Sequence, residues 1–124
     1  MTFPSVGLLV SGGHTDLYRI DAWGAYERLG GTRDDAIGEA FDKVARILEL
    51  GYPGGPEISR LAEKDRTEAV SREERWGMPR PMLDSGDLDF SFSGIKTHVR
   101  YTVRDAGSLT NTMKQEIARE FEDA

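Results

Sequence analysis

The first thirty residues carry short apolar runs separated by turn residues. Val6 to Val10 is almost continuously apolar, which predicts a buried strand. In residues 16–21, Leu17 and Arg19 alternate with Tyr18 and Ile20, which predicts a second strand. Residues 26–29 predict a third, short strand. The turn between the first two runs reads Ser-Gly-Gly-His, so we expect a β-hairpin there.

Residues 36–50 have the apolar spacing of an amphipathic helix. Thr32 or Asp34 is the expected N-cap, and Gly51 stands where a helix commonly ends. The apolar positions that carry this period are Ile37, Ala40, Phe41, Val44, Ile47 and Leu48.

The rest of the chain predicts three more helices and one more strand. Pro56 fits the first turn of a helix that runs to about Lys64. The sequence LDFSFSG alternates as in a half-buried strand, and Ser93 can cap a helix that carries Ile95, Val99 and Val103. A last helix from about Thr110, with Met113, Ile117 and Phe121 on one face, reaches residue 124 without a stop signal, so we expect an incomplete domain.

Residues 63–81 differ from their surroundings because they are mostly charged and keep no apolar period. We interpret this segment as a charged surface insertion that is solvated or forms a frayed helix. A binding arm is the alternative that the same composition allows.

Composition limits the class of protein. The chain has 124 residues, 38% of them hydrophobic, a net charge of -6 and no cysteine. These values fit a domain with a modest core and exclude disulfides and thiolate metal sites. The longest apolar run is too short to span a bilayer, so we expect a cytoplasmic protein without membrane contact. The acidic balance argues against broad binding of a nucleic-acid backbone.

The first candidate site is the turn at residues 11–14. Successive glycine N–H groups can form an anion-binding nest, with the Ser11 and Thr15 hydroxyls as further donors. An ordinary hairpin turn is the alternative. His14 is expected to support such a site rather than to bind a metal, because His98 lies on a different predicted helix.

The second candidate is the acidic sequence around residues 35–42. Asp35, Glu39 and Asp42 fall on one predicted helical face, where like charges repel unless a partner is present. Ribose hydroxyls, a metal or an arginine could be this partner. The alternative is a solvated helix face without any ligand. Gly38 weakens the helix interior, which indicates that backbone or ligand packs closely against it.

The third candidate is the sequence YPGGP, residues 52–56. Gly54 and Gly55 could let a base or sugar lie against the main chain. A tight corner between two helices explains the same glycines equally well.

Three ordered blocks together resemble one known family. VSGGHT, DDAIGEAFDKVARILELGYPGGP and LDFSFSGIKT are similar to the signature blocks of the TsaD (Gcp, Kae-type) family of tRNA N6-adenosine threonylcarbamoyltransferases, formerly named O-sialoglycoprotein endopeptidases. The resemblance implies an α/β fold of the actin-like ATPase (ASKHA, ribonuclease H-like) class. Because family members are more than twice as long, residues 1–124 resemble their central segment.

The resemblance also implies an activity and a site. The family transfers a threonylcarbamoyl group from threonylcarbamoyl-AMP to N6 of the adenosine beside the anticodon, in tRNAs that read codons beginning with A. Asp42 would bind the ribose and Gly55 would lie against the nucleoside, with His14 and Glu39 in support. The remaining substrate-binding residues implied by the resemblance are Leu9, Val10, Ser11, Gly12 and Gly13.

Cofactors and partners follow from the same resemblance. The family holds one divalent metal, iron or zinc, on ligands that lie outside this segment, so we expect no metal site within it. Its nucleotide is threonylcarbamoyl-AMP or ATP, and its partners are tRNA and accessory TsaB- and TsaE-like proteins.

Two further classes are weighed against this activity. A catalytically silent actin-like module that binds nucleotide and serves as a scaffold or partner subunit is the main alternative. A sugar-kinase-like phosphotransferase is disfavoured because the segment lacks a carboxylate base in its first phosphate loop. A protease is disfavoured because no serine nucleophile with a nearby base can be identified.

Overall fold

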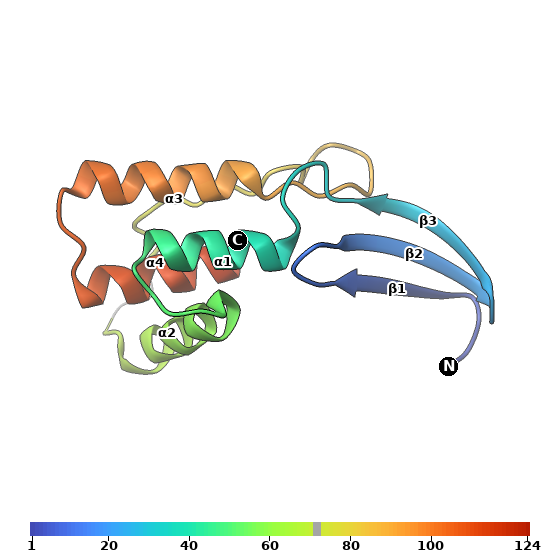
Figure 1. Cartoon of the computed structure of the whole chain (residues 1–124), viewed down its shortest axis with the longest axis horizontal. Helices are drawn as coiled ribbons and strands as arrows, with labels where there is room; N and C mark the ends of the chain where they lie inside the picture. The colour runs from blue at the N-terminus through green and yellow to red at the C-terminus, as the bar shows by residue number, and fades with distance from the viewer. Residues whose placement is uncertain (71–72) are drawn as a thin grey trace. The chain divides into compact units, whose positions relative to one another are not determined.

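The computed structural model describes residues 1–70 and 73–124 (Figure 1). These residues form two compact units, and each is described here by itself. The first unit comprises Met1–Ala40 and Pro81–Ser93, and the second comprises Phe41–Arg80 and Gly94–Ala124. No helix in the described part of the chain is long and apolar enough to cross a membrane.

A three-stranded antiparallel sheet forms most of the first unit. The strands are β1 (Ser5–Val10), β2 (Thr15–Ala22) and β3 (Ala25–Gly31), hydrogen-bonded in the order β1-β2-β3. Val10 pairs with Thr15, so the turn at residues 11–14 joins β1 to β2 directly. The three strands predicted from the sequence are therefore confirmed, with β3 longer than expected (Figure 1).

The prediction that residues 6–10 form a buried strand is wrong in one respect. Val6 is 66% exposed, and Leu8, Leu9 and Val10 are 48–57% exposed. Side chains project from the two faces of a sheet, and this exposure shows that neither face of β1 is closely covered in the described part of the chain. The apolar run thus forms a strand without being buried.

The strand predicted for LDFSFSG does not form. Phe90 makes a single parallel bridge to Thr32, and its N–H and C=O bond to Gly31 and Arg33 at 3.0 and 2.9 Å. Asp89 accepts a hydrogen bond from the Gly31 N–H at 3.1 Å and pairs with Arg33 at 2.9 Å. Carboxylates therefore satisfy groups that a strand ladder would otherwise use.

The four predicted helices are confirmed, with changes at their ends. They are α1 (Ile37–Ile47), α2 (Gly54–Glu68), α3 (Ser93–Ala106) and α4 (Asn111–Asp123). Thr110 caps α4 by accepting a hydrogen bond from the Met113 N–H at 3.2 Å. α1 ends before Gly51, because Glu49 takes the left-handed conformation (φ 58°) and the Leu50 N–H bonds back to the Ala45 carbonyl.

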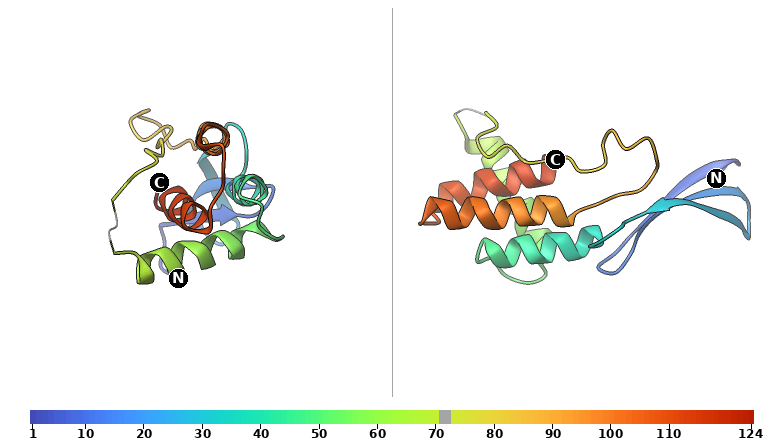
Figure 2. Two further views of the ribbon diagram at one scale, coloured as in Figure 1. Left: turned by 90° about the vertical axis from the view of Figure 1, so that its left-hand side faces the viewer. Right: turned by 90° about the horizontal axis from the view of Figure 1, so that it is seen from above.

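The apolar core of the second unit surrounds α4. In the end-on view of Figure 2, α4 lies between α2 and α3, and most of its last two turns is buried. Phe121 meets Phe41 edge to face, with ring centroids 4.9 Å apart. The fully or nearly fully buried apolar side chains of this unit are Val44, Ala45, Leu48, Ile58, Leu61, Ala62, Ile95, Val99, Met113, Ile117, Ala118 and Phe121.

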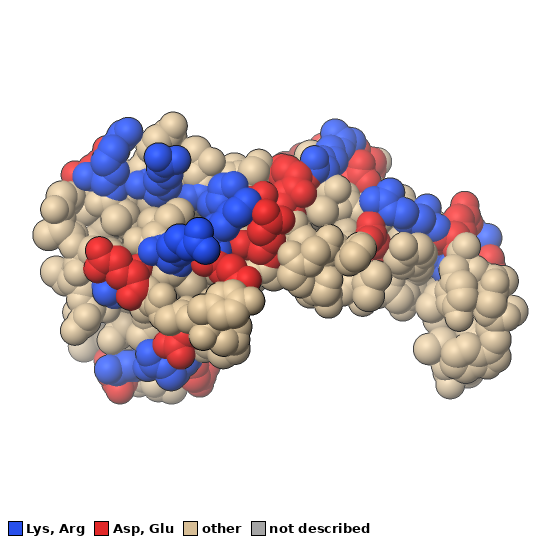
Figure 3. Space-filling view, in the orientation of Figure 1, with Lys and Arg blue, Asp and Glu red and all other residues tan. Residues whose placement is uncertain are grey.

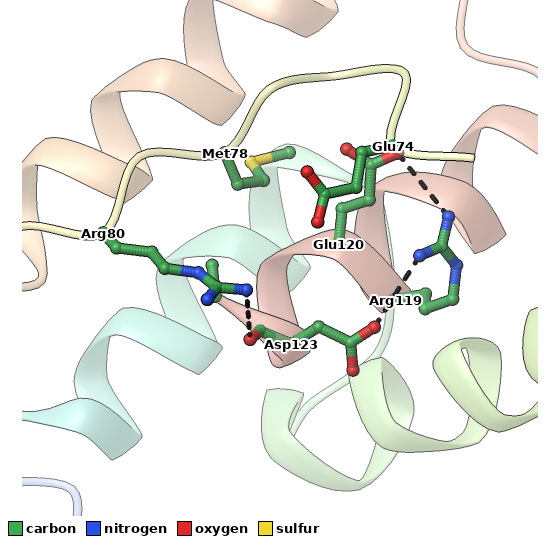
Figure 4. A pocket seen from close by; sticks show the side chains of 7 residues that line it. Glu74, Met78, Arg80, Arg119, Glu120 and Asp123 are labelled. Carbon is green, nitrogen blue, oxygen red and sulfur yellow. Dashed lines mark hydrogen bonds and ion pairs between the residues drawn. The ribbon is translucent and has the colours of Figure 1, made fainter. Parts of the chain in front are cut away.

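A buried ion pair joins α2 to α4 within this core. Asp65 and Arg119 are 4% and 5% exposed, and the Arg119 Nε lies 2.6 Å from an Asp65 carboxylate oxygen. The guanidinium also donates to the Glu73 carbonyl at 3.1 Å. Its weaker contacts with Glu120 and Asp123 complete a polar cluster around a pocket (Figure 4).

The segment interpreted as a charged insertion makes specific contacts where it is described. Residues 63–68 belong to α2, and residues 71 and 72 lie outside the described part. The Glu120 carboxylate accepts hydrogen bonds from the N–H groups of Arg75 and Trp76 at 2.6 and 2.9 Å. The Trp76 carbonyl lies 2.6 Å from a ring nitrogen of His98. Residues 75 and 76 are thus held against α4 and α3.

Candidate functional site

The Ser11 side chain closes the turn at residues 11–14 by accepting hydrogen bonds from it. The Ser11 N–H donates to the His14 carbonyl at 2.8 Å, and Ser11 Oγ accepts from the N–H groups of Gly13 and His14 at 3.2 and 2.9 Å. This differs from the predicted nest, in which those N–H groups face an anion. An incoming anion would compete with Ser11 Oγ for the same donors.

Thr15 serves α1 rather than the turn. Its side chain is 2% exposed, and Oγ1 accepts a hydrogen bond from the Ile37 N–H at 2.8 Å. This bond satisfies one of the free N–H groups at the start of the helix. The prediction that Thr32 or Asp34 caps α1 is therefore wrong, because the capping side chain is that of Thr15 in β2.

Gly38 allows the start of α1 to touch the turn. A Cβ at this position would lie 2.7 Å from the Ser11 carbonyl oxygen and 2.9 Å from the Gly12 Cα. The Gly38 N–H points at the same carbonyl, 3.3 Å away. The close approach predicted from this glycine is confirmed, and the group that approaches is backbone.

Asp42 connects α1 to the start of α2. Its Oδ1 accepts a hydrogen bond from the Gly54 N–H at 2.8 Å. The two glycines of YPGGP then differ. A Cβ at Gly54 would lie 2.7 Å from both Ala45 Cβ and Asp42 Cα, whereas a Cβ at Gly55 would meet nothing within 4 Å. The helix corner explains Gly54, and Gly55 remains open to a ligand.

The predicted acidic face is smaller than expected. α1 begins at Ile37, so Asp35 precedes the helix and only Glu39 and Asp42 lie on it. Three other predicted site residues are exposed, namely Leu9, Val10 and His14. Among residues 1–70 and 73–124, no three His, Cys, Asp or Glu residues come close enough together to hold a metal ion.

Sequence reasoning missed the role of Asp34. Its carboxylate accepts hydrogen bonds from Ser91 Oγ (2.5 Å), the Phe92 N–H (2.8 Å), the Ser93 N–H (3.1 Å) and Ser93 Oγ (2.8 Å). Partial burial raises the pKa of Asp34, but these four bonds outweigh burial and lower it to about 2. Asp34 thus stands at the start of α3, although the capping pattern in the sequence pointed to α1.

The low pKa of Asp34 predicts a stability change in acid. Its folded pKa of about 2 lies below the ordinary value of 3.8, so its contribution is complete above about pH 4 and is lost as the pH falls through 2. Asp34 is only slightly buried, so after allowance for solvent screening we expect this contribution to be about 1 kcal/mol. Thermal unfolding of the wild type and Asp34→Asn at pH 7, 4, 3 and 2 should show this difference shrinking below pH 4. A difference that stays constant down to pH 2 would contradict it.

Comparison with known proteins identifies the family. The sheet, the four helices and the glycine-rich turn define an α/β protein that fits part of an actin-like ATPase fold. A family model described as "TsaD: tRNA N6-adenosine threonylcarbamoyltransferase" matches residues 1–124. The chain belongs to this family.

Curated relatives agree with that assignment. A tRNA N6-adenosine threonylcarbamoyltransferase of Burkholderia mallei is 55% identical over 128 residues, covering 98% of this chain and 35% of the relative. Proteins of the same name from Paraburkholderia xenovorans and Methylobacillus flagellatus are 56% and 55% identical, and each alignment covers 98% of this chain and 34% of the relative. The chain therefore spans about a third of the length of these relatives.

Proposed function

We propose that this chain supplies the adenylate-binding part of a tRNA N6-adenosine threonylcarbamoyltransferase. The structural observation that carries the proposal is the contact of Gly38 with Ser11 and Gly12. This contact fixes a short, exposed glycine turn against the first residues of a helix. An anion bound there would accept hydrogen bonds from the Gly13 and His14 N–H groups in place of Ser11 Oγ.

The proposed reaction asks for orientation rather than strong acid–base groups. The adenosine N6 amine attacks the carbamoyl carbon of threonylcarbamoyl-AMP, a C–N bond forms, and the bond to the phosphate oxygen breaks. AMP leaves with the electron pair, and the amine loses a proton. Binding both reactants in line supplies most of the rate enhancement in such transfers. N–H donors can stabilise the negative charge that develops on the oxygens.

Residues of this chain would take separate parts of the adenylate. The turn at residues 11–13 would hold the phosphate, with Leu9 and Val10 beside it. Asp42 keeps one carboxylate oxygen for a ribose hydroxyl, because Gly54 uses the other. Gly55 leaves room for the nucleoside.

Other components would come from outside these residues. The described residues provide no ligand set for the family's iron or zinc, so no step here is assigned to a metal. We propose tRNA and TsaB- and TsaE-like accessory proteins as partners, and threonylcarbamoyl-AMP or ATP as the bound nucleotide. We propose that the transfer takes place in the cytoplasm.

A transfer assay tests the function. The complete gene product containing residues 1–124, supplied with its accessory proteins, threonylcarbamoyl-AMP and an unmodified tRNA that reads codons beginning with A, should form threonylcarbamoyladenosine. Nucleosides released by digestion would be measured by mass spectrometry. Adenylate binding without modified nucleoside would favour the silent scaffold, and neither binding nor product would overturn the proposal.

Two substitutions should weaken adenylate binding to different degrees. Asp42→Ala should cost about 1.5 kcal/mol, roughly tenfold in affinity, because it removes a charge-assisted hydrogen bond. Gly12→Val should weaken binding more. Gly12 has no positive φ and its Cβ would meet nothing within 4 Å, so the valine would obstruct the ligand without disturbing the fold. Calorimetric titration with an adenylate analogue would measure both, and unchanged affinity would place the site elsewhere.

We expect residues 1–124 to contribute only weakly to tRNA binding. Basic side chains lie along α3 in Figure 3, and Lys96 and Arg100 are one helical turn apart there. We expect both to act mainly as solvated helix charges. Replacing both with alanine in the complete gene product should therefore lower the salt slope of tRNA binding by less than about 1. A drop of about 2, measured by anisotropy at several salt concentrations, would instead show that both contact phosphate. Arg60→Ala on α2 is the matched control.

A further inference from the structure

Asp34 satisfies the start of α3 from outside that helix. The first N–H groups of any helix lack partners within it, and the helix dipole favours a negative charge beside them. The Phe92 and Ser93 N–H groups meet this need by donating to one Asp34 oxygen, while the Ser91 and Ser93 hydroxyls donate to the other. All four lone-pair sites expected of a carboxylate are then used.

The loop that carries Asp34 also leads directly to the candidate phosphate turn. Thr32 Oγ1 accepts from the Asp34 N–H at 3.3 Å and donates to the Asp35 carbonyl at 2.5 Å, which fixes the loop internally. Two residues later, the Ile37 and Gly38 N–H groups bond to Thr15 Oγ1 and to the Ser11 carbonyl. Hydrogen bonds therefore hold the segment of residues 32–38 to residues 91–93 at one end and to Ser11 and Thr15 at the other.

We propose that Asp34 is a positioning residue for adenylate binding, because it anchors to α3 the loop from which α1 meets the glycine turn. This inference rests on the proposed function. Asp34 itself makes no contact with substrate in this scheme, since its acceptor sites are occupied by residues 91–93. Loss of the carboxylate would let the start of α1 shift, and the turn it braces would shift with it.

The test compares Asp34→Asn with wild type in the complete gene product. We expect the KM for threonylcarbamoyl-AMP to rise about tenfold, while the KM for tRNA stays within twofold. A purely structural role would instead lower kcat by reducing the folded fraction and would leave both KM values unchanged. Asp84→Asn is the matched control, because Asp84 is exposed and its carboxylate makes no hydrogen bond or ion pair among the described residues.

A second variant keeps the test decisive if Asp34→Asn folds poorly. Ser91→Ala removes only one of the four bonds and should raise the same KM two- to threefold. Added to Asp34→Asn, it should cause almost no further change, because the two groups act through one interaction. Unchanged KM values in both single variants overturn the positioning role. A wild-type protein that neither binds a non-hydrolysable threonylcarbamoyl-adenylate analogue nor transfers the group overturns the proposed function, and the positioning role with it.

Discussion

Replacing Asp65 with alanine should lower the free energy of unfolding of the second unit by about 3–5 kcal/mol. The carboxylate is buried and lies 2.6 Å from the Arg119 Nε, which is buried as well. Removing one member of such a pair leaves an uncompensated charge in the core, and this loss is larger than the net contribution of the intact pair. The remaining acids near Arg119 are 3.6 and 3.7 Å away and would compensate only in part.

Urea unfolding of the 124-residue chain would measure this effect. The chain has two tryptophans, so a Trp23→Phe background leaves fluorescence from Trp76, which lies in the second unit. Glu68→Ala is the control on the same helix, because its contact with Lys64 is exposed and 3.9 Å long, and such pairs contribute little. Asp65→Leu combined with Arg119→Met should recover most of the loss. A loss below about 1 kcal/mol for Asp65→Ala would show that water or a rearranged acid solvates Arg119.

The sequence predicted the elements whose signals are local. The apolar periods of α1 and α4 and the start of the last helix near Thr110 are set by residues within a few positions of one another, and all three are present. Gly38 was informative for the same reason, because a glycine inside a strong helical pattern has few explanations other than close packing. The structure then identified its neighbour as the backbone of the glycine turn.

The errors arose where a partner is distant in sequence. Thr15 caps a helix that begins 22 residues later, and Asp34 bonds to residues 57 to 59 positions away. A capping pattern identifies a residue able to cap but not the helix it serves, so Asp34 was assigned to α1 instead of α3. The alternation in LDFSFSG was equally ambiguous, since its Asp and Ser side chains bond to the backbone and to Asp34 in place of a strand ladder.

The burial of the β1 run was overestimated for a related reason. A continuous apolar run is typical of a strand covered on both faces. Sequence pattern reports what a strand is suited to contact, whereas exposure depends on which elements are present beside it. Among the described residues, the exposure of Val6, Leu8 and Leu9 shows that neither face of β1 is closely covered.

The two glycines of YPGGP should respond in opposite ways to the same substitution. Gly54→Ala should destabilise the second unit by about 2–3 kcal/mol, because its Cβ would lie 2.7 Å from the Asp42 Cα and 2.9 Å from the Phe41 carbonyl oxygen. Backbone atoms of α1 cannot move aside as a flexible side chain would, so the start of α2 must shift. That shift would also lengthen the hydrogen bond from the Gly54 N–H to Asp42.

Gly55→Ala is the matched control, with the same added methyl group one residue further along. Its Cβ would meet nothing within 4 Å, so stability should change by less than about 0.5 kcal/mol. If Gly55 lies against the nucleoside, this variant should still bind an adenylate analogue more weakly, whereas a site elsewhere would leave affinity unchanged. Urea unfolding and calorimetric titration of both variants therefore separate the structural glycine from the ligand-binding one. Equal losses of stability in the two variants would show that the corner tolerates no side chain at either position, and the role proposed for Gly55 would then lose its support.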